Sequence, residues 1–189
     1  MIAIDLDNTI ICYDRAFAVA AARLDCLPES GPINKSTIKA TAIAAGGNTL
    51  WTCLQGIAYG EGITAAEIFP GCADFIAAAR EDLVIVSHKT KFPAIGHPTD
   101  LREAARTFLA TTPLADLPLL FLDSRIAKVA KIADLQPRAL IDDLPEVMTT
   151  DGFPATTVFH LFDPGDSHPC WTVSPRVRSW LEASETLIA

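Results

Sequence analysis

The sequence predicts an α/β protein, in which a three-layer α/β/α core with a parallel sheet carries an inserted helical cap. Three observations predict this fold. Short and nearly continuous apolar runs recur along the 189 residues, helical patterns lie between them, and several of the runs end in polar residues. Strands that are apolar along their whole length are typical of a parallel sheet covered by helices on both faces.

Five apolar runs are expected to form strands, at residues 2–6, 83–86, 117–122, 139–141 and 157–162. Helical patterns lie between them, notably at residues 71–81, 99–110 and 125–135. In such sheets ligands bind at the carboxyl ends of the strands. Asp5, Ser87 and Asp142 are therefore expected to meet at one edge of a Rossmann-like core.

A segment from about residue 14 to residue 69 departs from this alternation. It is typical of several helices, roughly at residues 14–25, 34–45 and 50–59, separated by turns rich in Gly and Pro. We interpret residues 14–69 as a helical cap inserted after the first strand, with its two ends acting as hinges. The core domain then comprises residues 1–13 and 70–189.

The composition of the chain limits the kinds of partner that we expect it to bind. The formal net charge is −8, whereas proteins that bind nucleic acid gather Lys and Arg on one face. A small anionic substrate needs only a few local cations. No basic and apolar leader opens the chain, and the apolar stretch 16–22 is too short to span a bilayer. The sequence favours no membrane association and a cytoplasmic location.

The five cysteines are scattered, odd in number and without a CxxC pair, which favours reduced thiols over a disulfide framework or a zinc ribbon. A zinc site built from His160, His168 and Cys170 lacks a fourth ligand and is disfavoured. Trp51 and Tyr59, in the proposed cap, are more typical of core packing than of a substrate platform.

Asp5-Leu6-Asp7-Asn8-Thr9 resembles DxDxT, the first motif of the haloacid dehalogenase superfamily. The other three motifs follow in order: Ser87 after a hydrophobic strand, Lys128 in a helix, and Asp142-Asp143 after another strand. The resemblance covers the whole core, and its first and fourth motifs are specific. Residues 128–147 are similar to small hydrolases of this superfamily, a match that names no substrate.

This resemblance implies a phosphatase that works through a covalent intermediate. Asp5 would accept the phosphoryl group as the nucleophile. Asp7 would protonate the departing alcohol and later deprotonate the attacking water. Ser87 would hydrogen-bond a phosphoryl oxygen, and Lys128 would neutralise charge on the nucleophile and phosphate. The resemblance also implies that the acid at the position of Asp7 favours phosphate-ester hydrolysis, because dehalogenase and phosphonatase members lack an acid at that position.

The acidic cluster predicts a cation. Carboxylates at Asp5, Asp7, Asp142 and Asp143 would repel one another unless a cation were present. Hard carboxylate oxygens that leave room for water and phosphate suit Mg²⁺. The resemblance implies metal contacts from the Asp5 side chain, the Asp7 backbone carbonyl and Asp142, with Asp143 bound directly or through water.

Several assignments stay open at this stage. Asp-x-Asp-x-Thr also suits a turn followed by a helix N-cap. Lys131, one turn after Lys128, competes for the role of the site lysine, although Lys128 lies nearer the helix start. Thr9 and His88 are expected to contact substrate. Lys89 and Lys91, like His88, fit either a substrate contact or a solvated loop.

The expected substrate is a small phosphorylated metabolite whose identity the sequence does not reveal. A phosphomutase of the same superfamily could use the same residues. A phosphate- or sugar-phosphate-binding protein without turnover is the alternative from another class. The oligomeric state is not indicated by the sequence.

Overall fold

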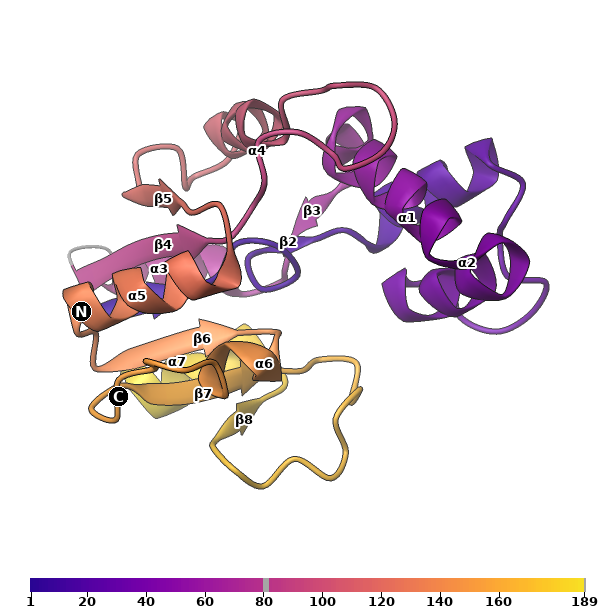
Figure 1. Cartoon of the computed structure of the whole chain (residues 1–189). Helices are drawn as coiled ribbons and strands as arrows, with labels where there is room; N and C mark the ends of the chain where they lie inside the picture. Colours follow the sequence, from indigo (N-terminus) through magenta and orange to yellow (C-terminus); the bar gives the residue numbers. More distant parts are fainter. Residues whose placement is uncertain (80–81, 189) are drawn as a thin grey trace. The chain divides into compact units, whose positions relative to one another are not determined.

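The computed structural model describes residues 1–79 and 82–188 (Figure 1). It divides into two compact units. Unit 1 comprises Met1–Ile11, Ile68–Lys89 and Asp116–Ala189, and unit 2 comprises Cys12–Glu67 and Thr90–Ala115. Among the described helices, none is long and apolar enough to cross a membrane.

Unit 1 is built around a six-stranded sheet with the order β5-β4-β1-β6-β7-β8. Every neighbouring pair is parallel. The strands are β1 (Ile2–Ile4), β4 (Leu83–Ser87), β5 (Leu119–Phe121), β6 (Ala139–Asp142), β7 (Val158–Phe162) and β8 (Arg176–Val177). The parallel α/β core is confirmed, and the five predicted strands are all present. The two-residue β8 was not predicted because it has no apolar run.

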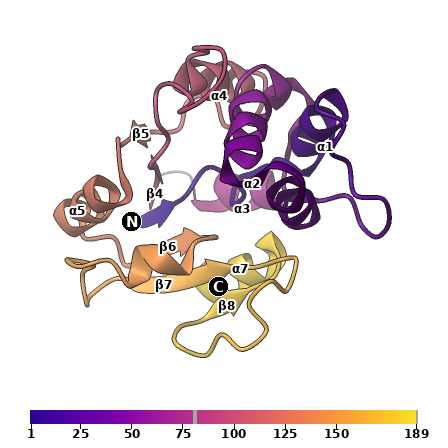
Figure 2. The same cartoon turned by 45° about the vertical axis from the view of Figure 1, so that its right-hand side comes forward.

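Helices cover both faces of this sheet (Figures 1 and 2). Alternate strand residues such as Ala3 and Leu140 form one buried cluster with Val129 and Ile132 of α5 (Arg125–Leu135). On α3 (Cys72–Ala79) and α7 (Trp180–Leu187), the rings of Phe75 and Trp180 pack at 4.9 Å. Apolar side chains on both surfaces of the strands are therefore buried, as in parallel sheets generally.

Helix α5 has the predicted bounds, and its start is defined by a cap. Ser124 accepts a hydrogen bond from the amide of Ala127, which satisfies one of the free donors of the first turn. The left-handed Gln136 ends the helix. The short α6 (Pro145–Met148) follows β6 and begins with proline, which is well suited to that position. For α3, the last two predicted residues, Arg80 and Glu81, lie outside the described residues.

Unit 2 is helical, with α1 (Asp14–Arg23), α2 (Lys35–Tyr59), the 3₁₀ helix η1 (Glu61–Ala65) and α4 (Leu101–Ala110). It differs from the predicted cap in one segment, because residues 90–115 belong to it as well. The reason is packing: α4 contacts α2 and η1. The helical pattern near residue 100 was recognised, but its partner helices could not be inferred from it.

Helix α2 is interrupted where the sequence predicts a break between two helices. Gly46 and Gly47 have non-helical backbone angles, and the φ of +65° at Gly47 lies in the region that favours glycine. At its start, Asn34 caps the helix by accepting a hydrogen bond from the amide of Thr37.

An aromatic cluster forms the core of unit 2. Phe17 stacks on Trp51 with ring centroids 5.0 Å apart, and Tyr59 meets Phe17 edge to face at 5.5 Å. Tyr59 also packs against Tyr13. These contacts agree with the expected core role of Trp51 and Tyr59, since aromatic rings contribute large buried areas.

The chain enters the first segment of unit 2 through the short strand β2 (Ile11–Cys12) and leaves it through β3 (Glu67–Ile68). They pair to form a separate two-stranded sheet. Neither strand was predicted, because a two-residue strand carries no periodic signal.

Candidate active site

Several of the predicted site residues, namely Asp5, Lys128, Asp142 and Asp143, lie together at the carboxyl edge of the sheet in unit 1. Strand β1 lies between β4 and β6, with Ile4 level with Ile85 on one side and with Ile141 on the other. Because the three strands are paired at the same height, the residues that follow or end them lie at one edge of the sheet. The order of strands also changes direction at β1, and ligands of open α/β sheets bind at such a point.

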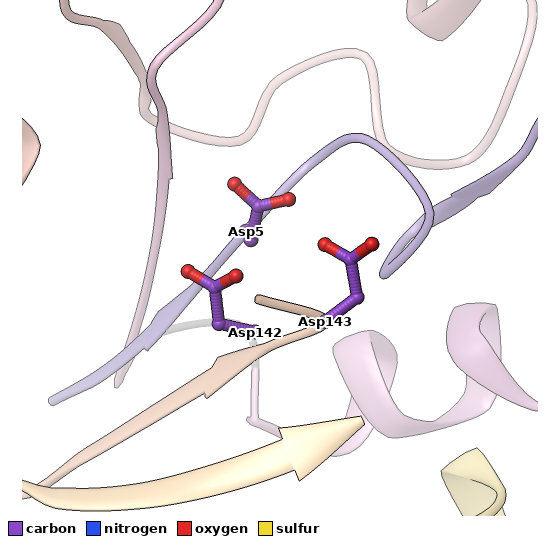
Figure 3. Close-up of side chains that lie close together, drawn as sticks. All are labelled: Asp5, Asp142 and Asp143. Carbon is purple, nitrogen blue, oxygen red and sulfur yellow. The ribbon is translucent and has the colours of Figure 1, made fainter. Parts of the chain in front are cut away.

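Three carboxylates gather at this edge. Figure 3 shows Asp5 beyond the end of β1, close to Asp142 and Asp143 at the end of β6. Each contributes an oxygen, and these oxygens lie within 4.8 Å of one another. Among the described residues, this is the one group of three or more His, Cys, Asp or Glu side chains arranged to hold a metal ion. His160, His168 and Cys170 therefore do not form a second such group.

Lys128 is the cation of this cluster. Its ammonium donates hydrogen bonds to Oδ1 of Asp5 and, over 2.7 Å, to Oδ2 of Asp142. The Lys128 side chain is fully buried, whereas Lys131 is partly buried. Burial alone would lower the pKa of Lys128, but the charges of Asp142 and Asp5 raise it above its ordinary value. Lys128 is therefore held as a buried ammonium between two carboxylates.

Asp5 has an unusual environment for a carboxylic acid. Burial raises its pKa to about 6, with Lys128 opposing the rise and the carboxylates of Asp142 and Asp7 adding to it. The ammonium of Lys128 therefore does not offset the combined effect of burial and the neighbouring carboxylates on the pKa of Asp5. A further cation at the cluster would stabilise the ionised form that a nucleophile requires.

Backbone contacts orient the two acids that flank Lys128. The amide of Leu144 donates to Oδ1 of Asp142 over 2.9 Å, so both oxygens of this buried carboxylate have partners. The amide of Asp5 donates to the carbonyl of Ile141 over 2.9 Å, which ties the end of β1 to β6. The first contact orients the Asp142 carboxylate, and the second positions the backbone of Asp5 beside β6.

Asp7 lies in a tight turn after β1. The left-handed Asn8 (φ +64°) follows it, a conformation that Asn tolerates better than most residues. The amide of Asn8 donates to the carbonyl of Ile11 over 2.8 Å, which closes the turn. Both carboxylate oxygens of Asp7 accept hydrogen bonds from Lys89, each over 2.9 Å.

Thr9, Ser87 and His88 also belong to unit 1. Thr9 is fully buried, and its hydroxyl has no hydrogen-bond partner among the described residues. Its carbonyl accepts a hydrogen bond from the indole of Trp180 over 3.1 Å. Ser87 ends β4 and is buried. Burial and the charge of Lys128 lower the pKa of His88, which favours a neutral imidazole.

The sequence left the role of Lys89 undecided. The structure buries it and joins it to Asp7. No motif marks this lysine, and its position two residues after Ser87 was the only available signal.

The overall fold is that of haloacid dehalogenase-like hydrolases. A hydrolase of this type from Bacillus subtilis, YfnB, in a magnesium-bound form, aligns with a TM-score of 0.62 and 16% identity over 100% of this chain and 98% of that one. A second from Deinococcus radiodurans, with bound phosphate and sodium, aligns with a TM-score of 0.59 and 14% identity over 98% of this chain and 93% of that one.

Protein tyrosine kinase A of Mycobacterium tuberculosis aligns as well, with a TM-score of 0.62 and 17% identity over 100% of this chain and 97% of that one. No protein-family model matches the sequence, and no curated protein matches it. At these identities the likeness defines the fold, and the function has to be argued from the site.

Proposed function

We propose that this chain is a phosphatase of the haloacid dehalogenase superfamily, which hydrolyses a small phosphorylated metabolite through an aspartyl-phosphate on Asp5. One observation carries the proposal: Asp5 directly follows strand β1 and lies beside two further carboxylates and a buried ammonium. A carboxylate nucleophile and a fixed cation are the two groups that phosphoryl transfer to a protein side chain needs.

The first step would transfer the phosphoryl group to Asp5. A carboxylate oxygen of Asp5 forms a bond to phosphorus as the bond between phosphorus and the leaving oxygen breaks. The leaving alkoxide takes a proton from Asp7. Lys128 would offset negative charge on the nucleophile and the phosphoryl oxygens, and Ser87 would donate a hydrogen bond to one of those oxygens.

The second step would regenerate the enzyme. Asp7, now a carboxylate, accepts a proton from water as the water oxygen bonds to phosphorus. The bond between phosphorus and Asp5 then breaks, which releases inorganic phosphate and restores the Asp5 carboxylate. This cycle is balanced, since the proton that Asp7 gives in the first step is recovered in the second.

The acidic cluster fits a bound Mg²⁺. Its donors are carboxylate oxygens, the ligands this ion prefers, and Lys128 is the cation bonded to Asp5 and Asp142. Asp5, Asp142 and Asp143 would hold the ion, together with the backbone carbonyl of Asp7. When bound, it would neutralise charge on the phosphoryl group. Magnesium in the Bacillus protein and phosphate in the Deinococcus protein support this proposal.

Unit 2 is proposed to act as the cap that selects the substrate. Its larger segment enters the chain between β1 and α3, so the chain passes through it between the nucleophile and the rest of the core. In folds of this kind, loops and small inserted domains supply specificity while the sheet supplies the chemistry.

The test is a panel of phosphorylated metabolites, assayed for release of inorganic phosphate with Mg²⁺ and with EDTA. At least one ester should be hydrolysed with Mg²⁺, and EDTA should abolish the release until excess Mg²⁺ is added. Full turnover by protein from which EDTA has removed the metal ions would refute the metal requirement. Binding of vanadate or beryllofluoride without hydrolysis of any ester would favour the binding-protein alternative, and conversion of a sugar phosphate into its isomer would favour a phosphomutase.

A further inference from the structure

Two lysines are buried in unit 1. Among the described residues, 1–79 and 82–188, the buried lysines are Lys89 and Lys128. Lys128 has a counterpart in the motifs of the superfamily, and the carboxylates of Asp5 and Asp142 explain its burial. Lys89 is not among the motif residues recognised in this sequence. Because burying an ammonium is costly unless it is paired, the position of Lys89 calls for an explanation.

Lys89 is paired with the carboxylate of Asp7. The Nζ of Lys89 lies 2.9 Å from each of the two carboxylate oxygens of Asp7, so a single donor group bridges both. The side chain of Lys89 is 3% exposed and that of Asp7 is 19% exposed. The buried ammonium of Lys89 thus contacts the Asp7 carboxylate, which is partly exposed to solvent, on both of its oxygens.

Neutralising the acidic cluster does not account for this arrangement. The three clustered carboxylates are Asp5, Asp142 and Asp143, and Lys128 bonds to the first two. Asp7 lies outside that trio, and its partial exposure already allows hydration. The contact of Lys89 with both oxygens of Asp7 instead bears on the orientation of that carboxylate.

We propose that Lys89 is a positioning residue for Asp7, holding its carboxylate in the direction needed for the two proton transfers. This inference rests on the proposed function, in which Asp7 protonates the leaving alkoxide and then deprotonates water. Lys89 itself exchanges no proton in the cycle. Misplacing a reacting group by about 1 Å can cost roughly 10²-fold in rate, so an unrestrained Asp7 carboxylate would slow both transfers.

The test compares Lys89→Met and Lys89→Arg with Lys91→Met as a matched control. Lys91 lies two residues further along, is exposed, and pairs with Asp100. Rapid-quench measurements of phosphoenzyme on Asp5 separate its formation from its hydrolysis. Nitrophenyl phosphate needs no protonation of its leaving group, whereas an alkyl phosphate does, so the pair of substrates isolates the role of Asp7.

In Lys89→Met, phosphoenzyme formation from the alkyl phosphate should slow by about 10- to 100-fold, while formation from nitrophenyl phosphate should change by less than about threefold. Hydrolysis of the phosphoenzyme should slow with either substrate. Lys89→Arg should recover part of each loss, because it keeps a buried cation with hydrogen-bond donors. Lys91→Met should match the unaltered protein in all three measurements.

A double-mutant comparison separates positioning from general stabilisation. Adding Lys89→Met to Asp7→Asn should cause no further loss in either step, because the group that Lys89 positions has already been disabled. Vanadate affinity, measured by calorimetry, reports whether the phosphate site survives in each variant. Should Lys89→Met fail to fold, Lys89→Gln, which keeps hydrogen-bond donors without the charge, serves in the same comparison.

Equal slowing with both substrates, or losses that add in the double variant, would overturn the proposal in favour of a purely structural lysine. Unchanged rates in Lys89→Met would overturn it as well. These results differ from failure of the proposed function, in which the unaltered protein would form no phosphoenzyme on Asp5 from any ester.

Discussion

The ammonium of Lys128 lies 2.7 Å from Oδ2 of Asp142, and neither side chain is exposed to solvent. The same ammonium bonds to Asp5. A buried ion pair is costly to break from one side, because the charge that remains is left without a partner in a medium of low polarity. The candidate site is therefore also a point on which the stability of unit 1 depends.

Lys128→Met should lower the free energy of unfolding by about 3–5 kcal/mol in protein freed of metal ions, because it leaves two buried carboxylates without their cation. Urea denaturation measures this change. Lys131→Met is the matched control, since Lys131 lies on the same helix and is partly buried; it should change the free energy by less than about 1 kcal/mol. Equal losses in the two variants would contradict the assignment of Lys128 as the buried cation of the site.

Asp5→Asn should give a folded protein without phosphatase activity. The amide keeps the shape of the side chain and removes one of the like charges around Asp142, but it cannot accept a phosphoryl group as the carboxylate does. Beryllofluoride should form an adduct on Asp5 of the unaltered protein, visible by fluorine NMR, and none in the variant. An adduct trapped on another residue would overturn Asp5 as the nucleophile.

Asp7→Asn should separate two classes of substrate. General acid–base groups contribute about 10²–10⁴-fold, so phosphoenzyme formation from alkyl phosphates should fall by a factor in that range. Formation from nitrophenyl phosphate should fall much less, whereas hydrolysis of the phosphoenzyme should be slow for both. The expected trace with nitrophenyl phosphate is a burst followed by a slow steady state. Equal loss of the burst rate for both esters would exclude Asp7 as the general acid.

His160 should make folding sensitive to mild acid. Burial lowers the pKa of this histidine below its unfolded value of 6.5, and its Nδ1 has no partner among the described residues. Between those two pKa values the unfolded chain binds more protons than the folded protein. The contribution of neutral His160 to stability is therefore complete above pH 6.5, and it is lost as the pH falls from 6.5 through the lower pKa that His160 has in the folded protein.

His160→Phe should therefore reduce the dependence of unfolding free energy on pH below 6.5, by at most about 1.4 kcal/mol per pH unit. Urea denaturation at several pH values measures it. The exposed His97 provides the control, and His97→Gln should leave the slope as it is. An unchanged slope in His160→Phe would mean that the buried imidazole does not titrate between the folded and unfolded states.

Much of unit 1 could be predicted from local patterns. Strands such as β1 and β4 are apolar runs, and burial on both faces of a parallel sheet requires such runs. The meeting of Asp5 with Asp142 followed from the same argument, because parallel strands end at one edge. Helix α7 could also have been found: Ser179 stands three residues before Glu182 and caps the helix by accepting from its amide.

Other features had no local signal. Residues 90–115 join unit 2 because α4 packs against helices formed by residues before 70. The pattern of a helix shows which of its faces is apolar, and it does not show which other helix covers that face. The same limit applies to β2, β3 and β8, whose pairing depends on chain neighbours brought close by the fold.

The sequence by itself determined the α/β class, the apolar strands and the acidic residues at their ends, since each depends on the order of neighbouring residues. The tertiary structure alone decided that Lys128 rather than Lys131 bonds to Asp5, and that Lys89 bonds to Asp7 across 82 positions in the chain. Such pairs depend on where two side chains lie in space after folding. Hydrophobic periodicity specifies helix α5, which carries Lys128, and strand β4, which Lys89 follows, and packing specifies which carboxylate each ammonium reaches.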